Sequence, residues 1–260
     1  MLVDSHCHLD FPELAIQLES VLDLMRENQV SRALCVSVKL EDFPQVRALA
    51  EQYPELYGSV GVHPDYEGVQ EATIENLVAL AAHPRVVAIG ETGLDYYRLK
   101  GDLEWQRERF RRHVRAAREC GKPLIIHTRS ASEDTLRIMR EERAGEACGV
   151  MHCFTESWEV AAAAMELGFY ISFSGIVTFK NAQTLKDVAR KVPLERMLVE
   201  TDAPFLAPVP FRGKLNQPGL VKHVAEEIAR LRDTSFEDVA RATTHNFFKL
   251  FGVEKDEIPT

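Results

Sequence analysis

The sequence contains no run of about 18 consecutive apolar residues, the minimum for a helix that crosses a lipid bilayer. Its first residues also lack a basic segment followed by an apolar one, which is the arrangement found in signal peptides. We therefore expect a cytoplasmic protein with no membrane association, and we expect it to act as a monomer.

Cysteine is scarce, and its spacing is unlike that of a common zinc site. There is no C-x-x-C, and the number of cysteines is odd, at five. Cys7, Cys35 and Cys153 lie in or beside apolar stretches, which favours buried free thiols in a reducing compartment.

Positive charge is also in short supply. The chain has 31 Lys and Arg against 40 Asp and Glu, a formal net charge of -9. This excess of acid argues against a protein that coats nucleic acid by bulk electrostatics, but it permits a local basic rim around a site that handles a phosphodiester. A hydrophobic content of 45% and a charged content of 27% are typical of a globular chain with a sizeable core.

Glycine-rich phosphate loops are missing as well. Neither G-x-G-x-x-G nor G-x-x-x-x-G-K-[ST] occurs, which disfavours a doubly wound open sheet. Short apolar stretches instead alternate with amphipathic ones. The predicted strands are Leu2–His8, Arg32–Val38, Tyr57–His63, Val86–Glu91, Pro123–His127, Gly149–His152, Phe169–Ser174 and Met197–Asp202. This alternation predicts an α/β fold, a single-domain (β/α)8 TIM barrel that spans residues 1–260.

The segments between these predicted strands have apolar residues at helical spacing. The predicted helices include Leu14–Met25, Trp105–Cys120, Glu159–Leu167, Ala182–Val192 and Phe236–Thr243. We expect Ser132 or Asp134 to cap the helix after the fifth strand, and Ser157 and Ser235 to cap two later ones.

Histidines and acids gather at the carboxyl ends of the predicted strands. These residues are His6, His8, His63, Glu91, His127, His152 and Asp202. The carboxyl ends of barrel strands meet in one mouth, where barrel enzymes hold their active sites. Burying an imidazole or a carboxylate away from water costs free energy unless the group is paired or binds a metal. The pattern therefore predicts a metal site, although any one of these histidines could be an ordinary hydrogen-bonded residue.

Several longer motifs resemble the TatD-type metal-dependent hydrolases in sequence and order. They are Asp4–Asp10 (DSHCHLD), Gly61–Pro64 (GVHP), Gly90–Tyr96 (GETGLDY), His127–Arg129 (HTR), His152–Phe154 (HCF), Glu200–Pro204 (ETDAP), Arg212–Pro218 and Asn246–Phe251. The match extends over nearly the whole chain. It departs from the commonest family pattern at Ala203, where serine is usual, and serine is not a metal-ligand type here. The resemblance implies an amidohydrolase-type TIM barrel with deoxyribonuclease activity, often a 3′ exonuclease.

Carried over residue by residue, the resemblance implies six metal ligands: His6, His8, Glu91, His127, His152 and Asp202. Glu91 is the best candidate to bridge two ions, because a carboxylate offers two oxygens. A bound metal lowers the pKa of water, and Asp202 could accept the released proton, so we assign catalytic roles to Glu91 and Asp202. We expect one or two divalent ions per chain, with Zn²⁺, Mn²⁺, Mg²⁺, Co²⁺ and Ni²⁺ all compatible.

Other residues are candidates for contact with the substrate. They are His63, Arg129, Arg212 and Lys214. Arg129 shares the strand parity of His127 and should lean into the mouth, where a guanidinium suits phosphate. Arg212 and Lys214 lie in the long segment after the eighth strand, a region that often binds phosphate in barrels. His63 is assigned a substrate or leaving-group role, with a structural hydrogen bond as the alternative.

Two acids lie one strand layer below the predicted ligands. Asp4 precedes His6 by two residues, and Glu200 precedes Asp202 by two. Buried acids need partners, so we expect Asp4 and Glu200 to orient the histidine rings of the metal site as second-shell groups.

Three functions fit these residues. The first is a metal-dependent phosphodiesterase whose substrate is DNA, for example single-stranded 3′ ends. The second is an amidohydrolase or ester hydrolase, such as a D-aminoacyl-tRNA deacylase, because the same site can polarise a carbonyl. The third is a non-catalytic metal-binding protein, which the complete set of ligands disfavours.

Overall fold

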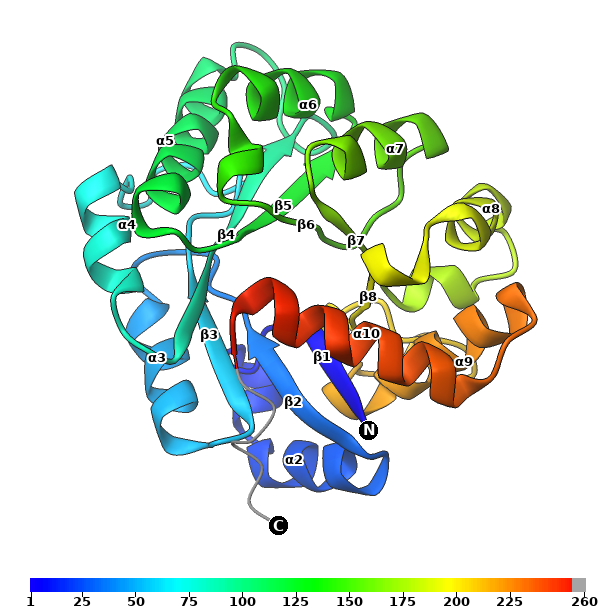
Figure 1. The fold of residues 1–260 in the computed structure, drawn as a ribbon. Helices are drawn as coiled ribbons and strands as arrows, with labels where there is room; N and C mark the ends of the chain where they lie inside the picture. Colours follow the sequence, from blue (N-terminus) through cyan, green and yellow to red (C-terminus); the bar gives the residue numbers. More distant parts are fainter. Residues whose placement is uncertain (254–260) are drawn as a thin grey trace.

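The chain is described from a computed structural model, and the description covers residues 1–253. Within this range eight strands pair in parallel and in sequence order (Figure 1). They are β1 (Leu2–Cys7), β2 (Val30–Cys35), β3 (Leu56–Val60), β4 (Val86–Asp95), β5 (Leu124–Arg129), β6 (Gly149–Met151), β7 (Tyr170–Phe173) and β8 (Met197–Val199). Each coincides with one of the predicted strands, with ends that differ by a few residues.

The sheet returns on itself just beyond β8. The backbone amide of Asp202 donates to the carbonyl of His6 at 2.9 Å, and the amide of His8 donates to the carbonyl of Ala203 at 2.8 Å. These bonds join the end of β1 to the segment after β8, so the predicted (β/α)8 barrel is confirmed.

Helices surround the strands (Figure 1). The α-helices are α1 (Pro12–Ala15), α2 (Leu18–Glu27), α3 (Phe43–Gln52), α4 (Ile74–Ala81), α5 (Glu104–Cys120), α6 (Ser132–Glu141), α7 (Trp158–Glu166), α8 (Gln183–Lys191), α9 (Val221–Arg232) and α10 (Phe236–Phe251). Short 3₁₀ turns lie at η1 (Ala144–Glu146), η2 (Gly175–Thr178), η3 (Leu194–Arg196) and η4 (Pro218–Leu220). None of the helices within residues 1–253 is both long and apolar enough to cross a membrane.

Two predicted helices differ from the structure. The Leu14–Met25 pattern is divided into α1 and α2, because Gln17 has a non-helical backbone (φ -127°, ψ 28°) while buried residues lie on both sides of it. The helix predicted to end at Thr243 continues to Phe251. Its last two turns carry apolar residues that pack on the barrel.

The predicted caps are confirmed at two of three helices. Ser157 accepts a hydrogen bond from the amide of Val160, and Ser235 accepts one from Asp238. Helix α6 has no side-chain cap, so the prediction of Ser132 or Asp134 is wrong. The carboxylate of Asp134 is instead bound to the hydroxyl of Tyr96 and the guanidinium of Arg137.

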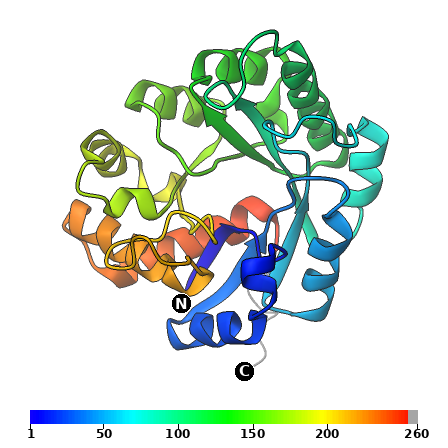
Figure 2. The ribbon, with the colours of Figure 1, turned by 180° about the vertical axis from the view of Figure 1, so that it is seen from behind.

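Helix α10 covers one end of the barrel. Figure 1 shows it lying across the strands, and in Figure 2, from the opposite side, it lies behind them. Its residues Phe247, Phe248 and Phe251 form one apolar cluster with side chains of β1 to β8, among them Val3 and Tyr57. The end that α10 covers is therefore packed with side chains, which leaves the carboxyl ends of the strands for the site.

Strand β4 contains an irregularity where its functional carboxylate lies. Ile89 pairs with Leu124, but the next pair along the two strands is Thr92 with Ile126, so β4 carries an extra residue relative to β5. Glu91 lies inside this bulge. Bulges next to active sites re-aim a side chain, and this one directs Glu91 toward the histidines.

Candidate metal centre

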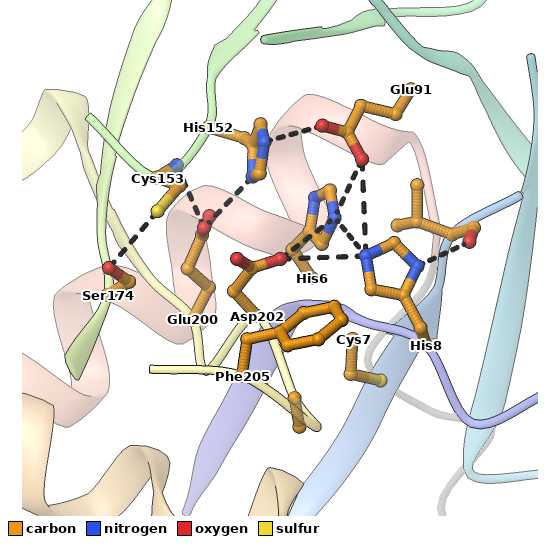
Figure 3. A network of polar contacts seen from close by, with 12 residues as sticks. His6, Cys7, His8, Glu91, His152, Cys153, Ser174, Glu200, Asp202 and Phe205 are labelled. Carbon is orange, nitrogen blue, oxygen red and sulfur yellow. Dashed lines mark hydrogen bonds and ion pairs between the residues drawn. The ribbon is translucent and has the colours of Figure 1, made fainter. Parts of the chain in front are cut away.

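Glu91 is the centre of a cluster of imidazoles. Its Oε1 lies 2.8 Å from Nε2 of His152, 3.2 Å from Nδ1 of His127 and 3.3 Å from Nε2 of His63. Its Oε2 lies 3.3 Å from Nε2 of His6 (Figure 3). The side chain of Glu91 is 3% exposed, so these four contacts take the place of water around a buried carboxylate.

Strand β1 and the segment after β8 supply the other face of the cluster. The Nε2 atoms of His6 and His8 are 3.3 Å apart, and Oδ1 of Asp202 lies 3.7 Å from the first and 3.5 Å from the second. Asp202 has a left-handed backbone with φ 58°, which aspartate tolerates better than most residues. The closure of the barrel therefore brings Asp202 beside the two histidines of β1 (Figure 3).

The outer nitrogens of three rings are held by neighbouring groups. Nδ1 of His8 donates to the carbonyl of Val36 at 2.9 Å, and Nδ1 of His152 donates to Glu200 at 3.0 Å. Nε2 of His127 donates to Asp95 at 3.2 Å. Such partners fix the orientation of the ring, and the opposite nitrogen of each ring points to Glu91 or Asp202, where in the neutral ring it could bind a metal.

The two expected orienting acids behave differently. Glu200 holds the ring of His152, as the strand parity predicts. Asp4 is fully buried but bonds to the backbone amides of His6 and Thr201 and to the hydroxyl of Thr201. Asp4 therefore does not orient a histidine ring, contrary to the expectation. The nearby ring of His6 has no hydrogen-bond partner for its Nδ1 among residues 1–253. Strand parity predicts the layer in which a side chain lies, but the partner depends on how β8 approaches β1.

Charges within the cluster shift its protonation. Burial favours the neutral acid at Glu91, but Coulombic interactions with the neighbouring histidines, His152 foremost, outweigh burial and hold the pKa of Glu91 well below its usual value. Burial also opposes protonation of His63, yet Glu91 and Asp65 raise the pKa of His63 to about 9. The site therefore stabilises an ionised carboxylate at its centre.

The donor set fits divalent metal ions. Three groups of three residues place one possible ligand atom each within 4.8 Å of one another: His6, His8 and Glu91; His6, His152 and Asp202; and His63, Glu91 and His127. Nε2 of His152 is buried and has no hydrogen-bond partner in the described part of the chain, although it lies 2.8 Å from Glu91. Converging imidazole nitrogens and carboxylate oxygens suit Zn²⁺, Mn²⁺, Co²⁺ or Ni²⁺. The six residues predicted as ligands all lie in this cluster.

His63 lies closer to the cluster than its assignment as a substrate contact implies. Its Nε2 faces Glu91, and its Nδ1 lies 2.5 Å from Asp65, which in turn binds Arg98 at 2.7 Å. A role in the metal centre is therefore as compatible with its position as one toward the substrate. Neither Asp65 nor Arg98 was predicted, although each lies within a few residues of a family-like motif.

Helix α5 holds the loop that carries His63. Nε2 of His113 accepts from the amide of Val62 at 3.0 Å, and Arg109 donates to the carbonyls of His63 and Tyr66. Gln106 donates to the carbonyl of Pro64 at 3.0 Å and accepts from the amide of Asp95 at 2.9 Å. Because all three side chains are buried, we assign Gln106, Arg109 and His113 a positioning role that sequence reasoning missed.

A cavity of about 530 Å³ opens over the cluster. Its lining includes His63, Arg98 and Arg129, and the guanidinium of Arg129 stacks over Tyr97 at 4.0 Å from the ring centroid. Arg212 and Lys214 are not among the described residues that line it. They lie over Phe179 and Phe211 instead, so of the predicted contacts only His63 and Arg129 face the cavity.

Known proteins are similar to this chain in sequence and in fold. The family described as TatD related DNase matches residues 3–252. The chain belongs to the TatD family. It is 47% identical over 260 residues to the uncharacterized metal-dependent hydrolase YcfH of Escherichia coli K12, covering 99% of this chain and 98% of that protein. It is 43% identical over 254 residues to the uncharacterized metal-dependent hydrolase YabD of Bacillus subtilis 168, covering 97% of this chain and 100% of that protein.

A solved TatD homologue has nearly the same structure. The crystal structure of YjjV, a TatD homologue from Escherichia coli K12, superposes with a TM-score of 0.90 at 30% identity. The match covers 97% of this chain and 98% of that one. The resemblance found in the sequence motifs is thus confirmed over the whole barrel, and the protein is a metal-dependent hydrolase of the TatD family with His, Glu and Asp groups able to hold metal.

Proposed function

We propose that this TatD-family protein is a metal-dependent deoxyribonuclease that hydrolyses phosphodiester bonds at the 3′ ends of single-stranded DNA. One observation carries the proposal: Arg98 and Arg129 line the same cavity as the cluster around Glu91. A small carboxylic ester has no charge for a guanidinium group to neutralise, whereas a phosphodiester is an anion.

The residues of the cluster have distinct tasks in this proposal. His6, His8 and Asp202 would hold one ion, His127 and His152 a second, and Glu91 would contact both. When bound, the metal lowers the pKa of water and withdraws charge from the phosphate oxygens. Asp202, ionised because its neighbouring histidines outweigh burial and lower its pKa, accepts the proton of the attacking water on its carboxylate.

His63 acts on the leaving group. Its ring lies between the carboxylates of Glu91 and Asp65, which hold it protonated near neutral pH. A protonated Nε2 can bind the phosphate and give its proton to the departing sugar oxygen. Arg129, supported by Tyr97, binds the next phosphate along the strand bidentately.

The test is an assay of the metal-reconstituted enzyme on four substrates in parallel. These are single-stranded DNA labelled near its 5′ end, the same strand in a blunt duplex, a D-aminoacyl-tRNA and an activated carboxylic ester. We expect a ladder of shortened strands from single-stranded DNA and at least a hundredfold loss of kcat/KM in Glu91→Ala and Asp202→Asn. Cleavage of the tRNA ester with intact DNA would show that the enzyme is a deacylase instead.

A further inference from the structure

One aromatic side chain stands exposed at the mouth of the cavity. Phe205, in the segment after β8, lines the cavity and is 52% exposed. Phe154, which also follows a strand end, is 1% exposed and belongs to the core. A single exposed aromatic ring on a surface is ordinary, so the position of Phe205 needs a second observation.

The backbone that carries Phe205 is rigidly held. The side-chain amide of Asn216 is buried and donates to the carbonyls of Thr201 and Phe205, at 2.9 and 2.6 Å. The backbone amide of Asn216 donates to the carbonyl of Pro204 at 3.1 Å. A buried amide thus fixes the loop on both sides of Asp202, and the exposed ring is presented in one place.

Phe205 also continues an aromatic wall that starts at the metal centre. The ring of Phe11 stacks on His8, with centroids 4.8 Å apart and planes at 20°. Phe205 meets Phe11 edge to face, with centroids 6.1 Å apart and planes at 79°. Figure 3 shows Phe205 beside Asp202 and His8. The aliphatic side chains of Ile176 and Leu206 also line the cavity.

The cationic wall lies across the barrel from the aromatic one. Phe11 and Phe205 follow β1 and β8, whereas Arg98 follows β4 and Arg129 is the last residue of β5. In a closed barrel with the order β1 to β8, the pair β8 and β1 is opposite the pair β4 and β5. Residues of the cluster around Glu91 line the same cavity as both walls. The mouth therefore offers an apolar stacking face on one side and guanidinium groups on the other.

We propose that the aromatic wall is the binding site for the base of the terminal nucleotide, and that Phe205 is its stacking face. This inference rests on the proposed function. With the scissile phosphate at the metal centre, the terminal base stacks on Phe205, and the phosphate of the preceding nucleotide binds Arg129 on the opposite wall. A base must be unpaired and unstacked to reach Phe205, which gives the site its preference for single-stranded ends.

A double-mutant cycle between Phe205 and the terminal base tests this contact directly. Wild type and Phe205→Ala are each assayed on one single-stranded oligonucleotide that ends in adenosine and on a second that ends in an abasic nucleotide. Removing either partner should lower kcat/KM by roughly tenfold, within the range of about 5- to 150-fold that base–aromatic stacking supports. Removing both should lower it little further, because the same contact is lost only once. Phe205→Trp should keep the preference for adenosine.

The matched control is Phe211→Ala. Phe211 lies in the same segment and packs against His223, but it is not among the described residues that line the cavity. This variant should cleave both ends like wild type. Equal losses on the adenosine and abasic ends in Phe205→Ala would overturn the stacking site while leaving the nuclease assignment intact. A wild-type enzyme that leaves both oligonucleotides uncut would overturn the nuclease assignment and the stacking site together.

Discussion

The carboxylate of Glu200 accepts a hydrogen bond from Nδ1 of His152 at 3.0 Å, and the same oxygen accepts another from the amide of Cys153 at 2.8 Å. Burial disfavours the charged imidazole, but Glu91 and Glu200 outweigh burial and raise the pKa of His152. Glu200 therefore orients the ring and increases the electron density that its Nε2 can offer to a metal.

Glu200→Gln should weaken metal binding without unfolding the protein. The amide oxygen of glutamine can still accept the bond from His152, but the negative charge behind the ring is lost. We expect a 10- to 100-fold weaker affinity, the usual effect of removing such a partner. Competition with a chromophoric chelator measures it. Glu166→Gln, an exposed change on α7, is the control. An affinity for Glu200→Gln within twofold of wild type would contradict the orienting role.

Asp4 should matter for stability through its oxygens rather than its charge. Burial raises the pKa of Asp4, so a neutral asparagine resembles the native side chain and keeps an acceptor for the amides of His6 and Thr201. Asp4→Ala leaves both buried amides unpaired, which we expect to cost about 2–5 kcal/mol, whereas Asp4→Asn should cost about 1 kcal/mol.

Urea unfolding in the presence of a chelator separates the two variants from any effect of metal binding. If Asp4→Asn is as destabilising as Asp4→Ala, the charge of Asp4 rather than its acceptor oxygens fastens β1 to the segment after β8.

The barrel and the convergence of its site were predictable because both follow from periodicity. Eight strand patterns imply a closed sheet, and closure alone brings Asp202 to His6 and His8. Histidines and acids at the ends of predicted strands can be recognised as possible metal ligands without knowing the paths of the loops. The site could therefore be located from the sequence even where strand ends were displaced, as at β4, which continues past Glu91 to Asp95.

The supports of the site were not predictable in the same way. Gln106 and Arg109 read as part of a charged amphipathic helix, and only the fold shows that they turn inward to backbone carbonyls 42 to 46 residues away. Lys214 shows the reverse: its place after β8 is typical of a phosphate contact, yet it lies over Phe211. Loop paths and helix rotations depend on tertiary packing, which spacing does not encode.

Gly93→Ala should disrupt the pairing of β4 with β5. Gly93 pairs with His127 and has φ 134°, and an added Cβ would lie 2.0 Å from the carbonyl oxygen of His127. We expect a loss of more than about 3 kcal/mol from the clash and the backbone strain together, measured by thermal unfolding.

Gly68→Ala is the control for positive φ without the clash. Gly68 has φ 70°, and an added Cβ there would meet nothing within 4 Å in the part of the chain that the structure describes. This change should cost about 1 kcal/mol. Similar losses in the two variants would show that backbone conformation, and not the close approach of the strands, requires the glycine at position 93.

His113 should make stability depend on pH in the acid range. It is fully buried between the amide of Val62 and the carbonyl of Arg109, and burial lowers its pKa from 6.5 to about 4. Above pH 6.5 the ring is neutral in both states. As the pH decreases from 6.5 to about 4, only the unfolded chain gains the proton, so the free energy of unfolding decreases by about 3 kcal/mol in all.

Urea unfolding from pH 7.5 to 4.5 should show a smaller loss of stability in His113→Gln than in wild type. His245→Gln, on the exposed side of α10, should keep the wild-type loss. Parallel curves for wild type and His113→Gln would show that another group causes the acid sensitivity.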